Sequence, residues 1–110
     1  MELKQRVSII SNDAYWKGTI LNEDEVRIEG RLEGSIEETN KVVIAAGAHV
    51  RGSIEAQVIT VAGELVGSVN CRGKLELVST GQIKGEATTR SLTVQEGAFI
   101  DAALEMTKHD

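Results

Sequence analysis

The feature that most constrains the fold of this chain is a short internal repeat. A tripeptide Gly-Ser/Thr-Ile/Val occurs four times and is followed by two weaker copies, which together begin at Gly18, Gly34, Gly52, Gly67, Gly85 and Ala102. The intervals between these positions are 16, 18, 15, 18 and 17 residues. A repeat of this length predicts that successive turns stack on one another, because a single turn cannot bury its own apolar face.

The apolar residues keep the same places in every copy, counted from its first residue as position 0. Positions −2 and +2 are apolar in all six copies, position −4 is Gly or Ala, and an apolar-x-apolar pair such as Val26/Ile28 or Leu92/Val94 lies upstream of each copy after the first. Positions −4, −2, 0 and +2 share one parity, so on strands we expect all four to face the core. The pattern predicts an all-β fold, a parallel β-helix of about six turns of 15–18 residues.

The composition fits a narrow aliphatic core. The chain has eleven glycines, no proline, and only three aromatic residues, which are Tyr15, Trp16 and Phe99. We expect glycine at the corners, and proline to be absent because each central strand must donate its backbone N–H groups to the next turn. Three aromatics and a net charge of −5 argue against base stacking and phosphate binding, so we expect no nucleic-acid partner. Cys71 is the single cysteine, which excludes an internal disulfide and predicts a semi-buried thiol near a corner.

With its six irregular turns and the closing segment Gly97-Ala98-Phe99-Ile100, the chain resembles the bactofilin family over residues 8 to 106. The resemblance implies a right-handed β-helix and a bacterial cytoskeletal protein that polymerises without nucleotide by stacking helix ends. It also implies filaments without structural polarity, in which the two filament ends are equivalent, and a scaffold role for cell-shape or cell-wall machinery. The end contacts are implied to use the phenylalanine of the terminal turn, here Phe99. Implied partners are further copies of the chain, cell-wall enzymes and other bactofilins.

The chain departs from the family in its short flanks. We expect an N-terminal extension at 1–7, a β-helix domain at 8–106 and a disordered tail at 107–110. Residues 1–6 lack the apolar stretch of a secretory signal, and only Met1 and Leu3 among them offer apolar contact to a bilayer. We therefore expect a cytoplasmic protein without direct membrane binding, although membrane association of the filament stays open.

The terminal turns carry the candidate site. Large apolar residues concentrate there, whereas the outward positions of the middle turns are mostly polar; the candidate polymerisation residues are Tyr15, Trp16, Leu21, Phe99, Ile100 and Leu104. A β-helix end is an open row of backbone N–H and C=O groups, which proteins normally block. From the residues alone, the aromatics either join copies end to end or cap the core of a monomer. The resemblance favours polymerisation.

The outward residues of the side faces form no pattern typical of a catalytic, metal-binding or phosphate-binding site. We therefore expect no enzyme activity, no metal and no cofactor. Glu37 and Glu55 stack at about the 5 Å separation of a retaining glycosidase pair, but turns without long loops build no cleft, which predicts an exposed acidic strip. No phosphate-binding G-x-x-x-x-G-K-[ST] motif occurs. Two alternatives stay open: a β-helical binding module that dimerises, such as the C-terminal domain of a division inhibitor, and a trimeric hexapeptide-repeat acyltransferase acting through His49.

Overall fold

The structure, a computed structural model, describes residues 7–21 and 24–106. This part of the chain consists of strands with connecting loops and contains no helix. The eight strands are β1 (Val7–Ile10), β2 (Tyr15–Leu21), β3 (Glu25–Ile28), β4 (Arg31–Ile44), β5 (His49–Val61), β6 (Glu64–Leu77), β7 (Gln82–Val94) and β8 (Phe99–Met106).

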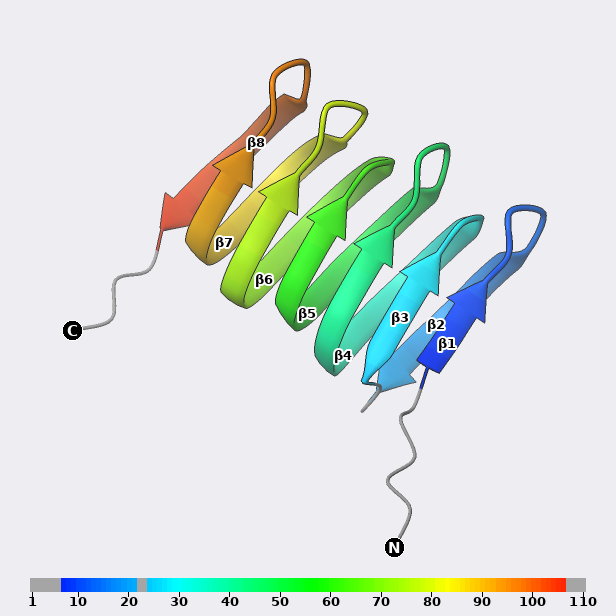
Figure 1. The fold of residues 1–110 in the computed structure, drawn as a ribbon. Helices are drawn as coiled ribbons and strands as arrows, with labels where there is room; N and C mark the ends of the chain where they lie inside the picture. Colours follow the sequence, from blue (N-terminus) through cyan, green and yellow to red (C-terminus); the bar gives the residue numbers. More distant parts are fainter. Residues whose placement is uncertain (1–6, 22–23, 107–110) are drawn as a thin grey trace, which may run out of the picture.

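The strands form a parallel β-solenoid of about six turns, as the repeat predicts (Figure 1). One row stacks β1, β3 and the second halves of β4 to β7, and the other row stacks β2, the first halves of β4 to β7, and β8. Each of the long strands β4 to β7 therefore begins in one row, bends at the lower edge of Figure 1 and continues in the other row. We call this place the lower bend. In Figure 1 the chain rises on the near side and descends on the far side as it advances, which is a right-handed coil.

The unequal repeat intervals come from the loops at the upper edge of Figure 1. Four-residue loops at 11–14, 45–48, 78–81 and 95–98 are each closed by a hydrogen bond of 2.8–3.1 Å from the fourth backbone amide to the first carbonyl. Two-residue connections at 29–30 and 62–63 take their place in the other turns. The intervals of 15 and 16 residues contain a short connection, and those of 17 and 18 contain a four-residue loop.

The core consists of columns of aliphatic side chains that run along the solenoid axis, as the repeat predicts. In the middle turns the residues at positions −2 and +2 and both members of each apolar pair are buried; in one turn these are Leu32, Ile36, Val42 and Ile44, none more than 1% exposed. The small residues at position −4, such as Gly30 and Ala48, are buried as well. Each inward residue of the middle turns thus packs on its counterparts in the two neighbouring turns.

The prediction that position 0 faces the core is wrong. Gly34 and Gly52, which pair in register at this position, are exposed and have φ angles of +134° and +133°. A Cβ atom on Gly52 would lie 1.7 Å from the carbonyl oxygen of Gly34, and the same approach recurs at Gly67 and Gly85. At such φ values the alternation of a regular strand is interrupted, and the chain turns a corner that only glycine fits.

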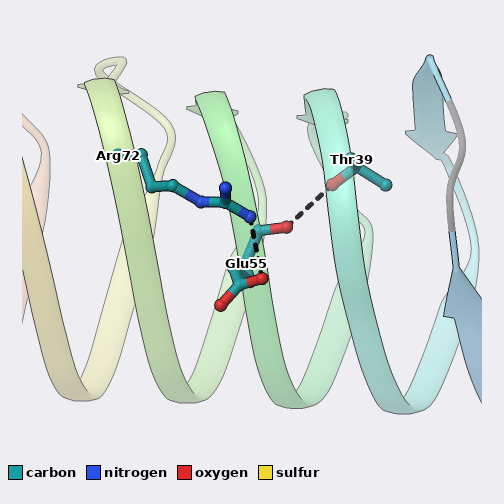
Figure 2. A network of polar contacts seen from close by, with 3 residues as sticks. All are labelled: Thr39, Glu55 and Arg72. Carbon is teal, nitrogen blue, oxygen red and sulfur yellow. Dashed lines mark hydrogen bonds and ion pairs between the residues drawn. The ribbon is translucent and has the colours of Figure 1, made fainter.

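The lower bend turns polar side chains inward at β-bulges. Thr39, Cys71 and Thr89 are no more than 2% exposed, and each donates a hydrogen bond to a backbone carbonyl. Thr39 Oγ1 reaches the carbonyl oxygen of Glu55 at 2.9 Å (Figure 2). These bonds offset the cost of burying polar groups. Cys71 is therefore fully buried, where the sequence predicted a semi-buried thiol.

The predicted ends of the domain are only partly described. Val7, the last residue of the predicted extension at 1–7, already belongs to β1, and the other residues of that extension lie outside the described ranges. The predicted disordered tail at 107–110 lies outside them too.

We predict that Gly52→Ala lowers the free energy of unfolding by roughly 4 kcal/mol or more, because the new methyl group would overlap the Gly34 carbonyl oxygen. Gly47→Ala is the matched control. Gly47 has a φ of +86°, but no atom lies within 4 Å of the place that its new methyl group would take, so backbone strain alone should cost about 1–2 kcal/mol. Urea unfolding of both variants measures the difference, and equal losses would show that the close backbone approach does not require glycine.

Candidate functional site at the two ends of the solenoid

The core is open at the C-terminal end. Val94 and Leu104 occupy inward columns of the last turn, yet they are 46% and 42% exposed. Leu77 and Ala87, in the same columns one turn earlier, are at most 1% exposed. Among the described residues, no further turn stacks on this last one, so side chains of the core columns contact solvent there.

The N-terminal end is more closed. Ile10 and Ile20, in the corresponding columns of the first turn, are only 6% and 7% exposed. Trp16 also lies in an inward column of the first turn and is 44% exposed. Its indole nitrogen lies 3.9 Å from the place of a Cβ on Gly18, at the glycine corner. The two ends therefore differ in how much core they expose.

Apolar residues also face outward near the two ends. Tyr15 and Leu21 on β2 and Phe99 on β8 are all about half exposed, and Ile9 on β1 is 62% exposed. In the middle turns of the described chain, Val58 alone among large apolar residues is exposed to a comparable degree. The apolar surface of the described residues is thus concentrated at the ends.

Tyr15 is held by a contact with the next turn. Its hydroxyl donates a hydrogen bond to the carboxylate of Glu33. This bond, followed by desolvation and the negative charge of Glu33, raises the pKa of Tyr15 above 10.0, and the charges of Arg31 and Arg51 partly oppose the rise. The phenol ring is therefore anchored at the rim of the first turn, while about half of the residue stays exposed.

Each end also presents unpaired strand edges. Among the described residues, β1 and β2 pair with a strand only on their C-terminal side, and β8 and the 91–94 segment of β7 pair only on their N-terminal side. A free edge beside exposed apolar side chains is a template for another strand. The ends can therefore bind a surface of the same kind by burial and backbone hydrogen bonds.

The structure separates the six predicted site residues into two groups at opposite ends. Tyr15, Trp16 and Leu21 lie on β2, and the other three lie on β8: Phe99, Ile100 and Leu104. Sequence reasoning missed Ile9 and Val94. Val94 could have been found as the second member of the last apolar pair, and Ile9 as an outward apolar residue in the first turn.

On the side faces of the described chain, polar side chains contact one another across turns. His49 Nδ1 lies 3.3 Å from Glu64 Oε1, and Arg72 Nη2 donates to Glu55 Oε1 at 2.9 Å. Within residues 7–21 and 24–106, no group of three or more His, Cys, Asp or Glu side chains is placed to hold a metal ion. No helix in these ranges has the length and apolar character needed to cross a membrane.

Comparisons with known proteins point to one family. Residues 8–105 match the family described as "Bactofilin: Polymer-forming cytoskeletal". The curated protein "Bactofilin BacO" of Myxococcus xanthus (strain DK1622) is 21% identical over 99 residues, which cover 90% of this chain and 79% of that protein. No solved structure matches the chain significantly.

We predict that Glu33→Gln lowers the pKa of Tyr15 towards 10.0, because it removes the carboxylate that accepts the hydroxyl bond. The chain has one tyrosine, so the phenolate absorbance in a spectrophotometric titration reports on Tyr15 alone. Since the pKa is raised in the folded state, the bond stabilises the protein below the ordinary tyrosine pKa of about 10 and is lost as pH rises through the raised value. Glu76→Gln, on another face, should leave the titration unchanged. An unaltered pKa in Glu33→Gln would contradict the assigned bond.

Proposed function

The chain belongs to the bactofilin family of polymer-forming cytoskeletal proteins, and on this premise we propose that it is a filament subunit that assembles through both ends of the solenoid. Residues 8–106 are the assembling domain in this proposal, and no nucleotide takes part. The protein is a structural component rather than an enzyme. The filament serves in the cytoplasm as a scaffold for cell-shape or cell-wall machinery, and its further partners are cell-wall enzymes and other bactofilins.

The observation that carries the proposal is the open core of the last turn. Val94 and Leu104 stay 46% and 42% exposed in the single chain, although their columns are buried elsewhere. Fully burying a side chain of this size is worth about 1.5–3 kcal/mol, so covering the exposed part of each contributes roughly 1 kcal/mol. The free edge of β8 adds backbone hydrogen bonds to the same contact. A second copy stacked on this end supplies both.

The difference between the two ends favours one alternative, a dimer. Ile10 and Ile20 are nearly covered at the N-terminal end, whereas the C-terminal end is open. If only the C-terminal ends join, the product is a discrete dimer, as expected for a β-helical binding module. Exposed Trp16, Tyr15 and Ile9 at the N-terminal end support a second contact and hence a filament.

Sedimentation at increasing protein concentration without nucleotide, followed by negative-stain electron microscopy, tests the proposal. Filaments that lengthen with concentration support end-to-end assembly. A particle that stops at two copies supports the dimeric alternative, and a sharp trimer supports the acyltransferase alternative. A protein that stays monomeric at every concentration contradicts the proposed function.

We predict that Phe99→Arg leaves a folded protein whose filaments are short or absent, with the concentration for half-assembly raised at least about tenfold. The reason is that a charge buried in an apolar contact without a partner is costly. Phe99 is about half exposed, so the substitution should spare the core. Assembly is measured by pelleting and microscopy, and folding by circular dichroism.

Gln82→Arg is the matched control for Phe99→Arg. Gln82 pairs with Phe99 in the same outward column, one turn away from the end, and is exposed. This variant should assemble like the unaltered protein. If Phe99→Arg assembles as well as Gln82→Arg, the residue does not lie in the contact.

A further inference from the structure

Two side faces of the solenoid differ in charge. The mixed-charge face consists of the outward side chains of residues 15–17, 31–33, 49–51, 64–66, 82–84 and 99–101, before the glycine corner. The acidic face consists of those of residues 19–21, 35–37, 53–55, 68–70, 86–88 and 103–105, after the corner. The acidic face carries four glutamates and no Lys, Arg or His among these residues.

Several of these charges are already paired within the chain. On the mixed-charge face, Glu33 accepts a hydrogen bond from Tyr15 and lies 3.9 Å from Arg51, and His49 pairs with Glu64. On the acidic face, Glu55 is paired with Arg72, which reaches it from the lower bend (Figure 2). These side chains already have partners within the chain, so the pairing considered below uses the charges that have none.

Most of the remaining charges on the two faces are opposite in sign. Lys17, Arg31 and Lys84 on the mixed-charge face are exposed and make no ion pair within the described ranges, and the same holds for Asp101 at its end. Glu37, Glu86 and Glu105 on the acidic face are likewise exposed and lack an ion-pair partner among the described residues. Apart from Asp101, which pairs in register with Lys84 on the neighbouring strand, these free charges are cations on the mixed-charge face and carboxylates on the acidic face.

The spacing of these free charges matches along the solenoid. Arg31 and Glu37 lie in the second turn, and Lys84 and Glu86 lie in the fifth. The two cations and the two carboxylates are therefore separated by the same three turns, or about 14 Å. Two solenoids placed side by side can match both pairs in one register, whether they run in the same or in opposite directions.

Both faces are also hollowed between these charges. Arg31 and Lys84 line a shallow groove on the mixed-charge face, and Glu37 and Glu86 line one on the acidic face. The charges stand at the rims of two depressions rather than on a flat surface. Long side chains from a neighbouring solenoid can enter each groove.

We infer that filaments of this protein associate side by side, with Arg31 and Lys84 of one copy against Glu37 and Glu86 of a copy in the neighbouring filament. This inference rests on the proposed end-to-end assembly. Exposed ion pairs are individually weak, but a filament repeats the same two pairs with every subunit, so the contact becomes strong through multiplicity. Bundles therefore form only after filaments do, and salt disperses them.

A second copy of the chain suits these faces better than an unrelated partner. The complementary charges come from one sequence at one spacing, so they recur along the whole length of two filaments. The net charge of −5 makes other lateral arrangements repulsive. An arrangement that pairs Arg31 and Lys84 with the acidic face replaces this repulsion with attraction at matched spacing.

The test compares filaments at about 0.05 M and about 1 M NaCl by electron microscopy and low-speed pelleting, in which only bundles sediment. The variants are the double changes Arg31→Glu/Lys84→Glu and Glu37→Lys/Glu86→Lys. Each should form single filaments and reduce the low-speed pellet at low salt at least about fivefold, to the level seen for the unaltered protein at high salt. An equal mixture of the two reversed proteins should restore bundles.

Arg27→Glu/Lys41→Glu is the matched control, because it makes the same charge change at exposed positions on the row opposite these faces. It should bundle like the unaltered protein. Bundles that persist in both reversed variants, a control that disperses equally, or unaltered filaments that never bundle would overturn the lateral pairing while leaving end-to-end assembly intact. A protein that forms no filaments at all would contradict the proposed function and the pairing together.

Discussion

The structure depends on the close stacking of one backbone turn on the next at the glycine corner. A Cβ on Gly34, Gly52, Gly67 or Gly85 would lie within 2.2 Å of the carbonyl oxygen one turn before, so no other residue fits. This contact holds successive turns in one register, which places each aliphatic residue directly over its counterpart. The narrow aliphatic core is built on this register.

A stack held in this way contains nothing in its repeating turns that closes its two ends. Every turn offers the next one the same edge and the same apolar columns, so a terminal turn can expose what the middle turns bury. In the last turn this leaves Val94 and Leu104 in solvent, and Ala102 replaces the corner glycine. In the first turn Ile10 and Ile20 are covered while Trp16 is not. Membership of a polymer-forming family agrees with surfaces of this kind.

The sequence predicted the features that recur in every turn, because six copies of one column reinforce each other. Features that break the strand pattern were not predictable in this way. Position 0 was assigned to the core because a positive φ at glycine is invisible to period-two alternation, and Cys71 is buried because a bulge turns it inward. A comparison that treats all turns alike could not predict that Ile10 is covered or that Val94 is exposed. The bond between Tyr15 and Glu33 depends on side-chain placement across turns.

The central claim is that the solenoid axis coincides with the filament axis. Fibre diffraction from aligned filaments tests it most directly, because the strands then lie across the fibre and the spacing between turns lies along it. The account predicts a strong meridional reflection at about 4.7–4.8 Å. The same reflection on the equator would mean that the solenoids lie across the filament, and that their ends are not the surfaces through which the subunits assemble.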